Sequence, residues 1–224
     1  MSRFLIVPAA GSGTRLGRSE PKALVPLLGR PLLLWTLQSL SSIPFARTVV
    51  AVPPERVSDF EALLQGRCEV VAGGQTRAAS VRQAFERLGA SSEDLVCIHD
   101  AARPLVTAHE AAEVLAAAER VGAAVAVIPV VDTVKRVKGA RIVGTVDREG
   151  LFAAGTPQAF RAALLARALG AGKEATDEAA LCESLGIPVA AVAVARLGFK
   201  ITTPEDLEIA KAVLKTRKTE DGRR

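Results

Sequence analysis

The chain has 224 residues, of which 49% are hydrophobic and 24% charged, so its composition excludes a disordered polymer and suits a single globular domain with a substantial core. Its net charge is +5, but the basic residues are spread along the chain and only 4% of residues are aromatic, which disfavours a nucleic-acid-binding protein. Because no apolar run is long enough to cross a bilayer and no secretory leader is visible, we expect a cytoplasmic protein without a membrane anchor, whose 3 cysteines are reduced thiols.

The first predicted strand, residues 4–7, leads directly into a loop of small residues. Gly11 and Gly13 have no Cβ atom, so the amide groups of this loop can converge on an anion such as a phosphate. Arg15 and Lys22 add two positive charges, the first a planar fork and the second a compact point charge. The loop therefore predicts a polyphosphate site.

Other interpretations of this loop differ in how well they fit. A glycine pair after a strand is often only a tight turn, and the loop alone does not decide between a turn and a ligand site. A dinucleotide-binding fingerprint needs a third glycine and an acidic residue about 20 residues further on, whereas Gly17 comes one position late and residues 34–38 are mainly apolar. The Walker A motif fails because no Gly-Lys-Ser/Thr sequence closes the loop.

Short β-rich runs alternate with helical patterns along the chain. The predicted strands are residues 4–7, 48–52, 69–71, 95–98, 124–128 and 189–194. Strands separated by helices imply right-handed βαβ units, so we predict an α/β fold: a single Rossmann-like domain with a mostly parallel, twisted sheet. The first helix is expected at residues 31–40, with Trp35 in the core. Ligands of such a sheet bind at the carboxyl ends of its strands.

Two further strand ends carry residue types that bind ligands. Gly73 and Gly74 follow the third strand, and Ser80 lies in the helix after them. Asp100 and Arg103 follow the fourth strand, where an aspartate can bind Mg²⁺ or a ribose hydroxyl and an arginine can pair with it or with a phosphate. The alternative for the glycine pair is a tight turn with a serine at the start of a helix.

A period of two predicts a β-hairpin over residues 133–137 and 141–146, with a turn at Lys138 and Gly139. A single hairpin is only marginally stable, so this apolar arm, at about 130–150, needs a surface to pack against. That surface can be a second subunit or the chain's own sheet.

Helix starts are predicted at three places in the last third of the chain. Thr156 is expected to cap a helix whose first residue is proline, residues 175–178 form a cap with an acidic first turn, and Thr203 precedes another helix. The domain is expected to span residues 1–214. Residues 215–224 are expected to form a charged, disordered tail.

Several of these segments together resemble a known family. The matching motifs are PAAGSGTRLG at 8–17 followed by PK at 21–22, HDAARP at 99–104, DTVKR at 132–136, VDREGL at 146–151, TPQ at 156–158 and TDEA at 176–179. Their order and spacing resemble those of 2-C-methyl-D-erythritol 4-phosphate cytidylyltransferase, and the resemblance extends from Arg3 to about Leu214. It implies a fold of the nucleotide-diphospho-sugar transferase type.

The resemblance also implies an activity, a cofactor and a set of site residues. The implied reaction is transfer of CMP from CTP to 2-C-methyl-D-erythritol 4-phosphate in the non-mevalonate isoprenoid pathway, with Mg²⁺ as cofactor and a homodimer formed through the arm. The implied nucleotide-binding residues are Pro8, Ala9, Ala10, Gly11, Gly13, Gly73, Gly74, Ser80, Asp100 and Ala101, and Asp100 is also the candidate metal ligand. The implied residues for the acceptor are Arg103, Thr133, Arg148, Thr156 and Thr176, of which Thr133 and Arg148 would reach a neighbouring subunit's site. Gln75 and Gly198 depart from the family pattern, in which relatives can carry an acidic residue and usually carry an asparagine, respectively.

Cytidylyl transfer brings two polyanions together, so its barrier falls mainly through positioning and through cations. Arg15 and Lys22 are therefore predicted to stabilise the transition state, with Lys200 assisting. The attacking phosphate is already an anion and needs no strong base, so His99 and His109 are expected to be structural.

Three rival functions are retained at this level. The nearest is another nucleotidyltransferase of the same fold, acting on ribitol phosphate or on a sugar 1-phosphate. The others are a nicotinamide-dependent oxidoreductase and a non-catalytic module that senses nucleotides.

Overall fold

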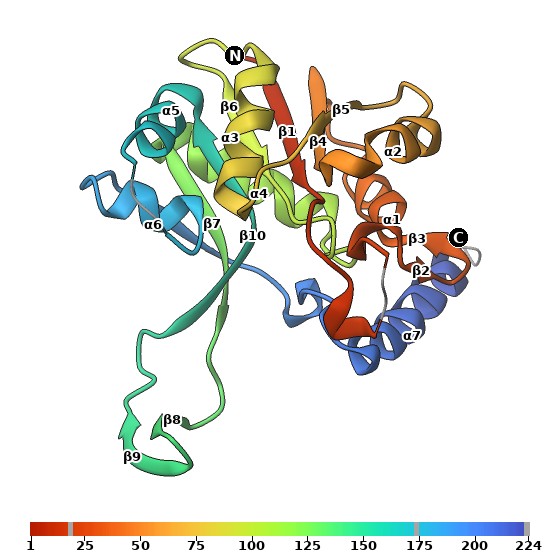
Figure 1. Cartoon of the computed structure of the whole chain (residues 1–224). Helices are drawn as coiled ribbons and strands as arrows, with labels where there is room; N and C mark the ends of the chain where they lie inside the picture. The colour runs from red at the N-terminus through yellow and green to blue at the C-terminus, as the bar shows by residue number, and fades with distance from the viewer. Residues whose placement is uncertain (18–19, 173–174, 222–224) are drawn as a thin grey trace.

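A seven-stranded mixed sheet forms the centre of the computed structural model, which describes residues 1–17, 20–172 and 175–221 (Figure 1). The strand order is β11-β7-β10-β6-β1-β4-β5. The strands are β1 (Arg3–Pro8), β4 (Arg47–Val52), β5 (Glu69–Ala72), β6 (Leu95–Ile98), β7 (Ala123–Pro129), β10 (Phe152–Arg161) and β11 (Ala190–Ala193). Only β10 runs antiparallel to its neighbours, β6 and β7, so the predicted mostly parallel sheet is confirmed.

The strand register brings several loops to one edge of the sheet. Pro8 of β1 lies opposite Ala51 of β4, and Ile6 of β1 lies opposite Ile98 of β6. Because these strands are parallel, the segments that follow their carboxyl ends emerge side by side. Loops distant in sequence are thereby brought together at this edge.

Helices cover both faces of the sheet. The helices α1 (Leu32–Ser39), α2 (Val57–Leu64) and α4 (Ala108–Val121) pack on one face, and α3 (Arg77–Leu88), α5 (Ala162–Gly170) and α6 (Glu178–Glu183) pack on the other. Strand β1 shows why both faces are apolar: Leu5 and Val7 join the first core cluster, while Phe4 and Ile6 join the second. Short 3₁₀ helices lie at Thr14–Leu16, Lys22–Leu24, Pro54–Arg56 and Arg196–Gly198.

A third, smaller apolar cluster joins α7 (Pro204–Asp221) to the two-stranded ribbon of β2 (Pro26–Leu27) and β3 (Arg30–Pro31). The helix does not end near Leu214. Instead it continues to Asp221, and Arg217 Nη1 donates a hydrogen bond to the carbonyl oxygen of Leu105 at 2.9 Å. The expected disordered tail is therefore helical through Asp221, and residues 222–224 lie outside the described residues.

The predicted hairpin is confirmed as β8 (Val134–Lys138) paired with β9 (Arg141–Val146). It lies at the end of an arm that extends from β7 and β10 and projects away from the body (Figure 1). Phe152 at the start of β10 lies opposite Pro129 at the end of β7, so the arm leaves the sheet at the edge where the parallel strands end. The hairpin strands pair only with each other among the described residues.

The expected helix start at Thr156 is wrong. Thr156 lies inside strand β10, and the next helix, α5, begins at Ala162. A threonine before a proline is a local signal for a helix start, whereas strand pairing depends on distant residues: Gln158 lies opposite both Ile98 and Val125. The register shifts between Ala154 and Gln158, and such an irregularity accommodates a proline that has no N–H for the ladder.

Candidate active site

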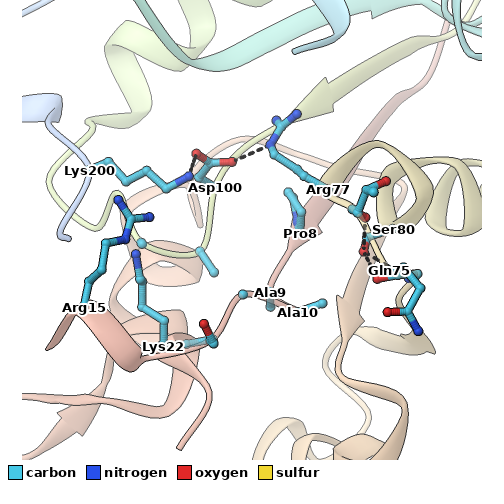
Figure 2. A pocket seen from close by; sticks show the side chains of 17 residues that line it. Pro8, Ala9, Ala10, Arg15, Lys22, Gln75, Arg77, Ser80, Asp100 and Lys200 are labelled. Carbon is cyan, nitrogen blue, oxygen red and sulfur yellow. Dashed lines mark hydrogen bonds and ion pairs between the residues drawn. The ribbon is translucent and has the colours of Figure 1, made fainter. Parts of the chain in front are cut away.

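A cleft of about 470 Å³ opens where the loops after β1, β5 and β6 meet (Figure 2). This volume lies in the ordinary range for a small-molecule site. The predicted site residues that line it are Pro8, Ala9, Ala10, Gly11, Arg15, Lys22, Gly74, Ser80, Asp100, Ala101 and Lys200. They come from distant parts of the chain, so the sheet edge assembles the site.

The loop after β1 folds back on itself and is held by backbone hydrogen bonds. The amide of Ala9 donates to Ala51 at 2.7 Å, and the amide of Lys22 donates to Gly11 at 3.0 Å. These bonds place two short 3₁₀ helices, which carry Arg15 and Lys22, on the same side of the cleft. Figure 2 shows both side chains directed toward Lys200 and Asp100.

Lys22 is a buried cation, with 7% of its surface exposed. Burial lowers its pKa, and the nearby charges of Lys200 and Arg15 lower it further. Three cations that repel one another around an open cleft are stabilised by an incoming anion. The electrostatics of the cleft therefore favour a ligand with several negative charges.

Asp100, at the end of β6, is surrounded by three cations. Its Oδ1 accepts from Arg77 Nε at 3.1 Å, its Oδ2 lies 2.9 Å from Lys200 Nζ, and Arg103 Nε lies 3.6 Å from Oδ2. Burial raises the pKa of this carboxyl, but Arg77, Lys200 and Arg103 overcome that effect and hold it well below its usual range. Asp100 is therefore a carboxylate at neutral pH.

Arg77 and Glu178 are site residues that the sequence reasoning missed. Arg77 Nη1 donates to both carboxylate oxygens of Glu178, at 2.9 Å and 2.7 Å, while its Nε donates to Asp100. Arg77 is the first residue of α3, and Thr76 caps that helix by accepting from the amide of Ala79. The cap locates the helix start, but no local signal reveals a partner 101 residues away.

The glycine pair after β5 lies against the first turn of α3. Ser80 Oγ donates to the Thr76 carbonyl oxygen at 3.0 Å and accepts from the Gly74 amide at 3.1 Å. A Cβ atom on Gly73 would lie 2.9 Å from Ser80 Oγ, and one on Gly74 would lie 2.4 Å from the Cβ of Ala79. Both glycines are therefore required by close packing, and Ser80 fixes the shape of this wall of the cleft.

Comparison with known proteins identifies the family. The family model described as 2-C-methyl-D-erythritol 4-phosphate cytidylyltransferase matches residues 4–216. The chain belongs to this family. The resemblance, the fold class, the enzyme class and the overall reaction expected from the motifs are thereby confirmed.

Relatives and solved structures of the cytidylyltransferase family agree with this assignment. The chain is 45% identical over 213 residues to the 2-C-methyl-D-erythritol 4-phosphate cytidylyltransferase of Frankia casuarinae, covering 93% of this chain and 80% of the relative. It is 39% identical over 221 residues to the bifunctional enzyme IspD/IspF of Desulfotalea psychrophila; the match covers 96% of this chain but only 57% of that longer protein. The crystal structure of the Thermus thermophilus cytidylyltransferase superimposes with a TM-score of 0.78 at 39% identity, covering 96% of this chain and 100% of the other.

Some residues predicted from the family resemblance do not line the cleft. Those outside the lining are Gly13, Gly73, Arg103, Thr133, Arg148, Thr156 and Thr176. Arg103 Nη1 donates to the carbonyl oxygen of Gly198 at 2.9 Å and so holds the segment that carries Lys200. Thr156 Oγ1 accepts from the amide of Asp100 at 3.0 Å. Both side chains fix neighbouring cleft residues in the structure.

Three others of these predicted residues, Thr133, Arg148 and Thr176, are exposed. Thr133 and Arg148 lie on the arm, and Thr176 precedes α6. The expected cap at this helix is present, and its capping residue is Asp177, whose Oδ1 accepts from the amide of Ala180 at 2.9 Å. The roles of these three residues toward a ligand stay predictions.

The two histidines occupy contrasting environments. His99 is fully buried; its Nδ1 lies 3.1 Å from Thr156 Oγ1 and its Nε2 lies 3.1 Å from the carbonyl oxygen of Arg103. Burial lowers the pKa of His99 to about 4, so the ring is neutral at physiological pH. His109 is exposed on α4. Neither residue lines the cleft, in agreement with the structural roles expected for them.

Asp100 is the carboxylate that a metal could use in this cleft. Within the described part of the chain, no group of three or more His, Cys, Asp or Glu residues is arranged to hold an ion. A lone aspartate beside a cationic pocket fits Mg²⁺, which is commonly held by one or two carboxylates together with substrate phosphates.

None of the described helices is both long enough and apolar enough to cross a bilayer.

Proposed function

We propose that this protein transfers the CMP moiety of CTP to 2-C-methyl-D-erythritol 4-phosphate in the cleft at the sheet edge. The products are 4-diphosphocytidyl-2-C-methyl-D-erythritol and pyrophosphate, an early step toward isoprenoid precursors. Family membership supports the reaction. The observation that carries the assignment of the site is the pairing of Arg15 and Lys22 on one loop, both lining the same cleft.

In the proposed reaction, a phosphate oxygen of the acceptor attacks the α-phosphorus of CTP and pyrophosphate leaves. Arg15 and Lys22 stabilise the charge that develops on the phosphoryl oxygens, and the nearby Lys200 assists. Lys22 suits this role because it is already buried and its charge is not neutralised by a close carboxylate in the described structure. The cations act mainly by holding two polyanions in line.

The nucleotide is proposed to lie with its phosphates along the loop of Pro8, Ala9, Ala10, Gly11 and Gly13. Its base would lie against the second glycine loop and its ribose against the end of β6. The residues proposed for these contacts are Gly73, Gly74, Ser80, Asp100 and Ala101. The open space around the position of a Cβ atom at Gly11 supports a close approach of the phosphates.

Mg²⁺ is the proposed cofactor. Asp100 would help to hold it together with the triphosphate, and the ion would neutralise the phosphates and the leaving pyrophosphate. The carboxylate state of Asp100 supports this assignment.

The acceptor site is proposed to need two copies of the chain. Arg103, Thr156 and Thr176 would come from one subunit, while Thr133 and Arg148 would come from the arm of the other. The arm supports a homodimer because its apolar side chains are exposed in a single chain; they are Val131, Val137, Ile142, Val143, Leu151 and Phe152. A hairpin of two strands with such a surface is stabilised when it packs against a partner.

We also propose that the enzyme works in the cytoplasm. The 3 cysteines, Cys68, Cys97 and Cys182, are free, and Cys97 and Cys182 are buried, as expected for a reducing compartment.

The test is pyrophosphate release from CTP on a panel of acceptors that includes 2-C-methyl-D-erythritol 4-phosphate, ribitol 5-phosphate and glucose 1-phosphate. The proposal predicts rapid release with the first acceptor and CTP, and little release with UTP or with the other acceptors. Release with another pair would assign the protein a different nucleotidyl transfer. Binding of CTP without release on any acceptor would indicate a sensing module, and tight binding of NADH would revive the oxidoreductase.

A further inference from the structure

A continuous set of buried polar contacts leads from the middle of β10 to the start of α6. Gln158 Nε2 donates to Asp177 Oδ2 at 2.8 Å, and Gln158 Oε1 accepts from the amide of Ala179 at 3.2 Å. These two partners flank Glu178 in the chain. The glutamine therefore fixes the backbone on both sides of Glu178, on a strand that is paired along both of its edges.

Glu178 is fully buried, and both of its carboxylate oxygens accept from Arg77. Arg77 uses Nη1 for both oxygens of Glu178 and uses Nε for Oδ1 of Asp100. The guanidinium group thus lies between two carboxylates, only one of which lines the cleft. Figure 2 shows Arg77 and Lys200 approaching Asp100 from opposite sides.

Glu178 has an electrostatic effect as well as a geometric one. Burial raises its pKa, and the charge of Arg77 opposes that rise. A buried carboxylate is costly unless it is paired, and an apolar pair of similar volume would join α6 to α3 at no electrostatic cost. The ion pair is therefore poorly explained by helix packing alone. It is better explained by the orientation that it gives to the Nε–H of Arg77, which faces Asp100.

We propose that Glu178 and Arg77 are positioning residues for Asp100. Glu178 fixes the plane of the guanidinium group, and Arg77 then holds Oδ1 of Asp100, so that Oδ2 faces Lys200 and the cleft. Neither residue takes part in bond making. This inference rests on the proposed role of Asp100 in binding the nucleotide.

The proposal is tested with two variants and one control. Glu178→Gln removes the charge at constant shape, and the paired variant Arg77→Met with Glu178→Met removes both charges, so no unpaired charge stays buried. Glu93→Gln is the matched control, because Glu93 also pairs with an arginine, Arg161, at 2.9 Å, but lies on the surface. The dissociation constant for CTP, in the presence of Mg²⁺, is measured by calorimetry, the KM for the acceptor by steady-state kinetics, and folding by thermal unfolding.

Both test variants are expected to bind CTP about tenfold more weakly, an effect typical of one lost coupling between neighbouring groups. The acceptor KM is expected to change less than about twofold, and Glu93→Gln is expected to match the wild type. A paired variant that unfolds cooperatively and binds CTP normally would overturn the proposal. Should Glu178→Gln fail to fold, the paired variant decides the question alone.

A double-mutant cycle with Asp100→Asn separates positioning from a purely structural role. If Glu178 acts through Asp100, adding Glu178→Gln to Asp100→Asn weakens CTP binding by less than about twofold further. A full tenfold further loss would mean that Glu178 acts independently, which refutes the proposal. Normal CTP binding by Asp100→Asn would refute the proposed role of Asp100 in binding the nucleotide. If Asp100→Asn binds CTP weakly but the paired variant binds it normally, only the positioning role of Glu178 and Arg77 is refuted.

Discussion

The cleft and the arm lie at the same edge of the sheet, but a single chain forms the whole charged cleft while it leaves the apolar side chains of the arm exposed. In the cleft, Arg15 and Lys22 from one loop meet Asp100 and Lys200 from two others, and hydrogen bonds hold each loop to a strand or to a neighbouring loop. In the arm, β8 and β9 pair only with each other within the described residues, and Ile142 is 66% exposed. One chain therefore forms a complete charged pocket, whereas the arm presents an apolar surface that a partner can cover.

The difference follows from how each region is supported. Loops at the carboxyl ends of central strands are fixed by strands on both sides, which preorganises a site for charged ligands. A two-stranded hairpin has no such support and is stabilised by packing against another surface. This difference is the basis of our proposal that one subunit binds the nucleotide and two subunits bind the acceptor.

The sharpest test of the cleft is Lys22→Ala, for which we expect the largest effect. Loss of one preorganised cation should lower kcat/KM by a factor of about 10² to 10³. The variant should unfold at the same temperature or a higher one, because burial already disfavours the charge of Lys22. Lys211→Ala is the control, since Lys211 pairs with Glu208 on the surface of α7. A folded Lys22→Ala enzyme with near-normal kcat/KM would remove Lys22 from the mechanism.

The next test concerns His99, which follows β6 next to Asp100 and is buried and neutral. The folded-state pKa, about 4, lies below the usual value of 6.5, so at pH values between these only the unfolded chain takes up a proton at this residue. Stability is therefore complete above pH 6.5 and falls with decreasing pH, by about 2 kcal/mol on reaching about pH 5. Urea unfolding at a series of pH values measures this loss.

The two histidines provide a matched pair for that experiment. His99→Gln should flatten the pH dependence between about pH 5 and 6.5. His109→Gln, which changes the exposed histidine, is the control. Equal slopes in the wild type and in His99→Gln would show that the acid sensitivity arises elsewhere.

The arm is tested by placing a charge on its apolar face, with a smaller expected effect on catalysis. Ile142→Asp should shift the protein from dimer to monomer in sedimentation experiments and raise the acceptor KM on the order of tenfold, with CTP affinity unchanged. Ile209→Asp is the control, since Ile209 is 51% exposed on α7. An Ile142→Asp protein that stays dimeric with a normal acceptor KM would show that the arm does not complete a neighbour's site.

The sequence predicted the residues that line the cleft better than the long-range contacts that hold those residues in place. Glycines and cations after an apolar strand are local signals, so the loop of Gly11, Arg15 and Lys22 could be placed at a strand end. Asp100 could be placed at a strand end in the same way, because it comes shortly after a predicted apolar strand. These residues meet in the structure because parallel strands align their ends.

Features that depend on distant pairing were missed. The sequence predicts a helix start within β10 because a threonine followed by a proline is typical of a helix start, and the pairing of β10 with β6 and β7 has no local signal in the sequence. The contact of Arg77 with Glu178 spans 101 residues, so no spacing rule identifies it. The last turns of α7 were not predicted because the charged sequence after Leu214 is typical of a disordered tail. The hydrogen bond from Arg217 to the carbonyl oxygen of Leu105, 112 residues away, has no local signal.

The most direct test of the account is a crystal structure of the protein with Mg²⁺ and a CTP analogue that carries a methylene bridge between its α- and β-phosphorus atoms. The account predicts that the triphosphate lies along residues 8–15, with Arg15 and Lys22 contacting its oxygens and the base against Gly74 and Ser80. A nucleotide bound elsewhere, with Arg15 and Lys22 facing solvent, would contradict it.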